Sequence, residues 1–198
     1  MMVQGLLIDV LMNKQKLIIR HDDFDFRMGT EFYIAIHEHF IVNDLTETAV
    51  IQISTHGRVP EFDKKKELIN YMNNSPNWNL QIHGWSHDHY HEMPYTEIVR
   101  DMSAAFFYFQ KLFNKLPTMW YSPYNGHSEE MENAAKFLGL TIDNEDIGIR
   151  RFVDKIDWKD EKFQGHSLYF HGWKWQEMEY FEEMIKLAKE VVYGTPEV

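Results

Sequence analysis

Short apolar or β-branched runs alternate along the chain with longer segments whose apolar residues recur every three or four positions. The short runs are typical of strands, and the longer periodic segments are typical of amphipathic helices. The predicted strands are Lys16–Ile19, Thr48–Ile53, Asn79–Ile82, Thr118–Trp120, Leu140–Ile142 and Ser167–Phe170. Strands that alternate with helices pair in parallel through right-handed crossovers, so the pattern predicts an α/β sheet or barrel.

The helical segments have recognisable ends. Pro94 stands at the start of one, and Gly139 and Gly194 stop two others. The predicted helices are Pro94–Phe113, Met131–Leu138 and Trp175–Val192, with further ones at Phe32–Val42 and Glu61–Met72. The stretch Asp143–Lys162 is dense in charges of both signs, and we expect a long loop there with at most one short strand.

Size and composition narrow the class of protein. The 198 residues, of which 44% are hydrophobic, suit one globular domain spanning 1–198. The formal charge of −11 repels phosphate backbones and anionic lipids, so a nucleic-acid partner is not expected. Because there is no cysteine, any metal ion has to be held by His, Asp or Glu, and the chain has 11 histidines.

The N-terminal residues are apolar over only a few positions and lack the features of a signal peptide. Other apolar stretches are shorter than the ~20 residues that a membrane span needs. We therefore expect a soluble, cytoplasmic protein without a membrane partner, and the sequence carries no indication of oligomeric state.

Polar residues, many of them histidines or acids, follow five of the predicted strands. These segments read Arg20-His21-Asp22-Asp23, Ser54-Thr55-His56, His83-Gly84-Trp85-Ser86-His87-Asp88-His89, Tyr121-Ser122-Pro123-Tyr124 and His171-Gly172-Trp173. In parallel α/β folds the carboxyl ends of the strands converge on one face, where ligands bind. We therefore expect these segments to share one pocket.

Some of these residues are of the types that bind divalent metal ions. His83 and His87 can both turn toward one ion if Gly84 permits a tight turn. Two adjacent carboxylates, Asp22 and Asp23, repel each other unless a cation or proton absorbs their charge. Asp23, His83 and His87 together would form a two-His, one-carboxylate set with open positions. The alternatives are two exposed imidazoles and a solvated or helix-capping acid pair.

These segments, in their order along the chain, resemble the motifs of the polysaccharide deacetylases, the NodB-homology group of carbohydrate esterases. That family's motifs are T-F-D-D-G, H-T/S-x-x-H, R-x-P-Y/F, D-x-x-D-W and a strand ending in L-x-H. The corresponding segments here are His21-Asp22-Asp23, His83-Gly84-Trp85-Ser86-His87, Tyr121-Ser122-Pro123-Tyr124, Asp154-Lys155-Ile156-Asp157-Trp158 and Leu168-Tyr169-Phe170-His171. The resemblance covers the chain from about Lys16 to Trp173.

The resemblance implies a distorted (β/α) barrel and a metal-dependent hydrolase acting on carbon–nitrogen bonds other than peptide bonds. Asp23, His83 and His87 would hold a divalent ion, Zn²⁺ in the first instance with Co²⁺, Mn²⁺ or Ni²⁺ as alternatives. Asp22 would be the base and His171 the acid that protonates the leaving amine. A backbone N–H near Tyr124 would help to stabilise the oxyanion.

Several positions depart from the family pattern. Tyr121 stands where the family has an arginine that orients the base, and Gly84 replaces a hydroxyl residue. Without that arginine, Asp22 needs a partner from elsewhere, and the candidates are Arg20, Arg150 and Arg151. A second assignment, with Asp23 as base and Asp25 as ligand, breaks the adjacency of the two acids.

The remaining marked residues have two interpretations each. Tyr124 and Trp173 are predicted to bind substrate, as aromatic faces suit a sugar ring, although aromatic residues are commoner in cores. Asp157 would orient His171 from behind it, or match the fourth motif by chance. His171 itself could be a packed barrel histidine. The remaining histidines are expected at the rim or surface, with His37 and His39 on the solvent face of a helix.

The leading hypothesis is a hydrolase that removes an N-acetyl or other N-acyl group from an amino sugar or its polymer. Two alternatives remain. One is a catalytically impaired relative that binds carbohydrate, which the tyrosine at position 121 favours. The other keeps the metal chemistry but acts on a non-sugar amide or ester.

Overall fold

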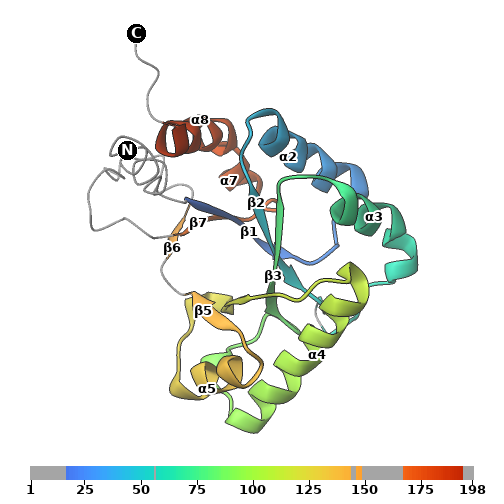
Figure 1. Ribbon diagram of the computed structural model, residues 1–198, viewed down its shortest axis with the longest axis vertical. Coiled ribbons are helices and arrows are strands. Elements are labelled where there is room, and N and C mark those ends of the chain that lie inside the picture. The colour runs from blue at the N-terminus through green and yellow to red at the C-terminus, as the bar shows by residue number, and fades with distance from the viewer. Residues whose placement is uncertain (1–16, 56, 144–145, 149–166, 194–198) are drawn as a thin grey trace, which may run out of the picture.

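The computed structural model describes residues 17–55, 57–143, 146–148 and 167–193, and these form a parallel sheet surrounded by helices (Figure 1). The strands are β1 (Ile18–Phe24), β2 (Glu47–Gln52), β3 (Trp78–Gly84), β4 (Met119–Tyr121), β5 (Thr141–Asp143), β6 (Asp146–Gly148) and β7 (Ser167–Phe170). Their order in the sheet is β5-β4-β3-β2-β1-β7-β6, and every neighbouring pair is parallel.

Helices connect the strands from β1 to β5 in turn, two further helices follow β7, and all lie outside the sheet (Figure 1). They are α2 (Thr30–Val42), α3 (Lys66–Asn74), α4 (Tyr95–Phe113), α5 (Glu129–Phe137), α7 (Trp175–Met178) and α8 (Phe181–Tyr193). Ser128 caps α5 by accepting a hydrogen bond from the Met131 N–H, which satisfies one of the free donors at the helix start. The predicted α/β class is confirmed.

The sheet curls on itself. Its two edge strands, β5 and β6, are separated by only two residues in the chain. Asp143 and Asp146 are therefore three residues apart, which limits the distance between their Cα atoms to about 11 Å. Opposite edges of the sheet come close together, and the architecture is the distorted (β/α) barrel expected from the sequence.

The core has two parts. The larger cluster lies under α3, α4 and α5 and is rich in aromatic side chains, with Phe24, Phe109 and Trp120 fully buried. The smaller one packs α2 and α8 against β1 and β7 through residues such as Phe40 and Phe170. The apolar stripes seen in the sequence thus face the sheet, as amphipathic helices do.

Two predicted boundaries are wrong in ways that matter for the site. β1 continues to Phe24, so the acid pair lies within the strand rather than after it, and β3 similarly includes His83.

The predicted C-terminal helix is broken into α7 and α8, and Trp175 in α7 is two-thirds exposed instead of contributing to an apolar stripe. Pro94 is the residue before α4, which begins at Tyr95.

A bulge explains how β1 carries two adjacent acids to one place. The pairing of β1 with β2 shifts between His21 and Phe24, and Asp23 has a left-handed φ of 53°. In a regular strand Asp22 and Asp23 would point to opposite faces. The irregular backbone, which Asp tolerates better than most residues, removes that alternation.

No helix in the described part of the chain is long and apolar enough to cross a membrane.

Candidate active site

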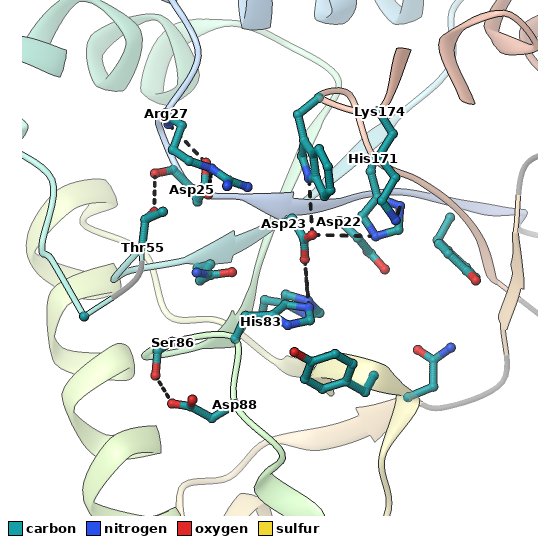
Figure 2. Close-up of a pocket in the computed structure, with 17 residues that line it drawn as sticks. Asp22, Asp23, Asp25, Arg27, Thr55, His83, Ser86, Asp88, His171 and Lys174 are labelled. Carbon is teal, nitrogen blue, oxygen red and sulfur yellow. Dashed lines mark hydrogen bonds and ion pairs between the residues drawn. The ribbon is translucent and has the colours of Figure 1, made fainter. Parts of the chain in front are cut away.

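A cavity of about 850 Å³ opens at the carboxyl ends of β1, β3 and β7, where the predicted site segments were expected to meet. Its lining includes all seven described residues of the predicted site, namely Asp22, Asp23, His83, His87, Tyr124, His171 and Trp173. Figure 2 shows Asp23 between His83 on one side and His171 on another, with Arg27 and Thr55 across the cavity from His171 and Lys174. Parallel strand ends have brought residues from distant parts of the sequence together.

Asp23, His83 and His87 converge closely enough to hold one metal ion. The Oδ1 atom of Asp23 lies 3.2 Å from Nε2 of His83 and 3.1 Å from Nε2 of His87. Ligand atoms at ~2.0–2.1 Å from a tetrahedral zinc ion are about 3.3 Å apart, so the spacing suits such an ion. Gly84, at φ 136°, gives the turn between the two histidines, and a Cβ there would lie 2.9 Å from the Tyr90 ring.

The hydrogen bonding of His83 leaves a place for a proton or a metal ion between its ring and Asp23. Its Nδ1 lies 2.8 Å from the carbonyl oxygen of Tyr121, which can only accept, so Nδ1 carries a proton. In the neutral ring Nε2 then presents a lone pair to the Asp23 carboxylate. Two lone pairs facing each other need a proton or a metal ion between them. A backbone carbonyl behind the ring is also the usual support of a metal-bound histidine.

Asp22 is held by a buried arginine from its own strand. Arg20 donates from Nε to Oδ1 of Asp22 at 3.1 Å and from Nη2 to Oδ2 at 2.6 Å. Its guanidinium also donates to Ser167 Oγ at 3.1 Å and lies 4.5 Å from the centre of the Tyr121 ring. Tyr121, which replaces the family's arginine, thus packs against the arginine that contacts Asp22.

Arg20 also controls the ionisation of Asp22. Burial by itself would raise the pKa of Asp22, but the positive charge of Arg20 and its hydrogen bonds outweigh that effect, so the pKa lies below its ordinary value. Burial likewise acts to raise the pKa of Asp23, and hydrogen bonds with His83 and His87 hold it well below its usual range. Both adjacent acids are therefore ionised near neutral pH.

His171 is oriented by Glu177, a residue of α7. The Nδ1 atom of His171 lies 3.0 Å from Oε2 of Glu177, and the same oxygen accepts the His171 backbone N–H at 2.7 Å. The opposite ring atom, Nε2, lies 3.7 Å from Oδ2 of Asp23, at the site. Burial acts against ionisation of Glu177, but its contacts with His171 lower its pKa overall, so it is a carboxylate that fixes the ring.

A buried network behind the site links β1, β2, α2 and the loop after β7. Glu47 accepts from His21 Nδ1 at 2.7 Å and contacts His37 Nδ1 at 2.9 Å, while His37 Nε2 lies 2.9 Å from the carbonyl oxygen of Pro76. His21 Nε2 accepts the backbone N–H of Gly172 at 3.2 Å. The loop that carries His171 is thereby tied to β1.

The prediction that His37 faces solvent is wrong. Its side chain is fully buried and stacks on Trp78 at a ring distance of 3.6 Å. The reason is the acidic partner that β2 supplies, since Glu47 and the Pro76 carbonyl satisfy both ring nitrogens. His39, two residues on, is half exposed, as expected.

The two predicted substrate-binding aromatics lie at the mouth. Trp173 is 41% exposed and donates from Nε1 to Oδ2 of Asp23 at 3.2 Å. Arg27 and Lys174 approach its ring, at 5.3 and 5.1 Å from the centre. Tyr124, with a left-handed φ of 58°, lies edge-on to His87 at 4.3 Å.

Asp25 does not join the metal-binding cluster. Its carboxylate pairs with Arg27 and accepts the Arg27 backbone N–H at 3.1 Å. Burial raises the pKa of Asp25, and Arg27 only partly offsets this. The assignment with Asp25 as ligand and Asp23 as base is therefore not favoured by the contacts.

The remaining predictions fall on residues that the structure does not describe. Asp157, Arg150, Arg151 and His56 lie outside the described residues. The carboxylate found behind His171 is Glu177, which the sequence analysis missed because it lies six residues downstream and outside any of the five motifs. The only feature of the sequence that could have indicated Glu177 is its position as an acid in the first turn of the helix that follows His171.

Comparison with known proteins agrees with this geometry. The family model for polysaccharide deacetylase matches residues 31–142, more than half of the chain. No curated protein matches the sequence.

Solved structures of the family share the fold. A carbohydrate esterase family 4 enzyme from Streptomyces lividans has a TM-score of 0.68 at 13% identity, with 88% of each chain covered. A peptidoglycan deacetylase from Bacillus subtilis gives 0.67 at 15% identity, covering 90% of this chain and 85% of its own.

A pseudoenzyme of the same family is equally similar. The protein from Bacillus anthracis gives a TM-score of 0.69 at 13% identity, over 90% of this chain and 62% of its own. This chain thus spans less than two thirds of that protein's length. The family model and the shared fold establish that the chain belongs to the polysaccharide deacetylase family.

Proposed function

We propose that the chain is a divalent-metal-dependent hydrolase that removes an N-acetyl or other N-acyl group from an amino sugar or polysaccharide. One observation carries the proposal. Beside the three residues that could hold a metal ion, Asp22 and His171 are each held in place by a charged side chain. Arg20 holds Asp22, and Glu177 holds His171, around Asp23, His83 and His87.

Asp23, His83 and His87 would hold the ion, with zinc as the first candidate and Co²⁺, Mn²⁺ or Ni²⁺ as alternatives. Two imidazoles and one carboxylate leave coordination positions open. When bound, the ion supplies Lewis acidity toward a carbonyl oxygen and toward water.

Asp22 is the proposed base. It is ionised, lines the cavity and does not belong to the three-ligand set. Arg20 donates one hydrogen bond to each carboxylate oxygen of Asp22, which fixes the plane of the carboxylate. Each oxygen has a second lone pair that can accept a proton. Asp22 would take the proton from the water that attacks the amide carbon.

His171 is the proposed acid. Glu177 and Lys174 contact Nδ1 and orient the ring so that Nε2, the atom that would carry the transferred proton, faces the site. An amine is a poor leaving group unless it is protonated, and His171 Nε2 would provide that proton. The products would be acetate and a free amine.

Tyr124 and Trp173 would bind the substrate at the mouth. A sugar ring that stacks on Trp173 would lie close to Arg27 and Lys174, which approach the same indole ring. A backbone N–H near Tyr124 would donate to the developing oxyanion.

Acetate release from N-acetylated oligosaccharides tests the proposal. We expect release by the metal-loaded wild type and a loss of about 10²–10⁴-fold in Asp22→Asn, which removes the base. Metal content should be unchanged in that variant and lost in His83→Ala/His87→Ala. Equal release by wild type and Asp22→Asn would contradict the assigned base.

The second candidate is a catalytically impaired relative that binds carbohydrate. It is favoured by Tyr121 at the position of the family's arginine and by the pseudoenzyme from Bacillus anthracis among similar structures. Oligosaccharide binding without acetate release would support it. Release of other acyl groups, or from small non-sugar amides or esters, would indicate the same chemistry on another substrate.

A further inference from the structure

A second hollow of about 600 Å³ lies beside the mouth of the candidate active site. It shares Asp25, Arg27 and Thr55 with the larger cavity, so the two lie next to each other. Its other walls come from Phe26 and from residues 58–65 of the β2–α3 connection. They combine an apolar surface with cations: Val59, Pro60, Arg58, Lys64 and Lys65.

The ion pairs in this side pocket leave two positive charges uncompensated. Arg27 pairs with Asp25, and Lys64 Nζ pairs with Glu61 at 2.6 Å. Lys65 donates to the carbonyl oxygen of Met28 at 2.9 Å, a neutral acceptor that leaves its charge in place. Arg58 has no ion pair with any residue of the described part of the chain.

The surplus is unusual for this chain, whose formal charge is −11. A local positive potential next to an acidic site attracts an anionic group and selects where it binds. The backbone of Arg58 is fixed by a tight turn, in which Thr55 and Arg58 exchange N–H···O bonds at 2.9 Å in both directions. An arginine held at its backbone loses less freedom when it binds a ligand.

We propose that the side pocket binds a carboxylate that the substrate carries in addition to its N-acyl group, as in an acidic sugar. Arg58 presents a planar fork that suits a carboxylate. Two free cations among the acids Asp25 and Glu61 match a monoanion better than a doubly charged phosphate. Val59, 39% exposed, and Pro60 would contact the C–H surface of the sugar ring. The inference rests on the proposed function for its orientation relative to the reacting amide, but binding itself does not require turnover.

Binding of D-glucuronate, D-glucose and D-glucose 6-phosphate to the full chain tests this inference. Calorimetric or NMR titration at low ionic strength should give roughly five- to tenfold tighter binding of D-glucuronate than of D-glucose, the range for one charge-assisted contact. The preference should disappear in Arg58→Gln and reverse in Arg58→Glu. Arg100→Gln, an exposed arginine on α4 paired with Asp101, is the matched control and should keep the preference.

The outcomes separate this inference from the proposed function. Equal affinity for D-glucuronate and D-glucose in the wild type would overturn it, as would an undiminished preference in Arg58→Gln, which would place the carboxylate elsewhere, for example on a bound metal ion. Tighter binding of the phosphate than of D-glucuronate would contradict the monoanion. Neither result depends on acetate release, and failure to release acetate would leave the binding preference intact.

Discussion

At the residue scale, the arginine that contacts the proposed base, Asp22, comes from the same strand as Asp22 itself. The position that carries arginine in the family holds Tyr121, and Arg20 reaches the same acid from two residues upstream in β1. Tyr121 packs on the guanidinium, so its aromatic ring is compatible with the exchange. In the sequence, Tyr121 in place of the family's arginine favours an impaired relative. In the structure, Arg20 supplies an arginine contact to Asp22 from another position.

This exchange gives a kinetic prediction. Arg20→Lys keeps a positive charge but loses the two-pronged contact, so Asp22 should turn out of its plane and kcat should fall about tenfold or more. KM should change little, because Arg20 does not line the cavity. The control is Arg100→Lys on α4, where kcat should be unchanged. An unchanged kcat in Arg20→Lys would show that Asp22 needs no fixed orientation.

A prediction for Glu177 follows from its lowered pKa. A carboxylate whose folded pKa lies below its unfolded value adds stability above the unfolded pKa and loses it as the pH falls through the folded one. Glu177→Gln should thus lower the free energy of unfolding by about 1 kcal/mol near pH 7, and the difference should shrink below about pH 4.

Denaturant unfolding from pH 3 to 7 measures this difference. Glu183→Gln on α8, an exposed acid near Lys186, serves as the control and should show almost no effect. A difference between wild type and Glu177→Gln that grows as the pH falls would contradict the sign.

At the scale of elements, the loop after β7 depends on the buried His21–Glu47–His37 network. A Cβ at Gly172 would lie 2.5 Å from His21 Nε2, which is closer than packing allows. Gly172→Ala should cost about 1–3 kcal/mol of stability and displace His171. Gly29→Ala is the control, since its Cβ would meet only the flexible Glu31 carboxylate at 3.2 Å. Thermal unfolding of both variants measures the difference, and equal losses would contradict the role of the network.

The same elements show what the sequence could predict. The alternation of short apolar runs with amphipathic segments was sufficient to predict the α/β class and the meeting of strand ends, because both follow from periodicity and parallel pairing. The bulge at Asp23 and the burial of His37 could not be predicted, since each depends on partners far along the chain. Glu177 lies only six residues from His171, but it was missed because no local pattern in the sequence links the two.

At the scale of the whole molecule, a bound ion should stabilise the fold. The three ligands come from β1, β3 and the turn after β3, so an ion would join segments about 60 residues apart. At a free concentration 100 times its dissociation constant, an ion adds about 2.7 kcal/mol, or roughly 5–10 °C in the melting temperature. His83→Ala/His87→Ala should show no such shift, and differential scanning calorimetry with and without zinc provides the measurement.

In the proposed function, hydrolysis of an N-acyl group depends on an ion held by Asp23, His83 and His87. This dependence is tested most directly by the rate of acetate release from an N-acetylated oligosaccharide as zinc is titrated into metal-depleted protein. The rate should rise with added zinc and level off at one ion per chain. One ion bound per chain with no acetate released from N-acetylated sugars, or release that does not depend on the metal, would contradict it.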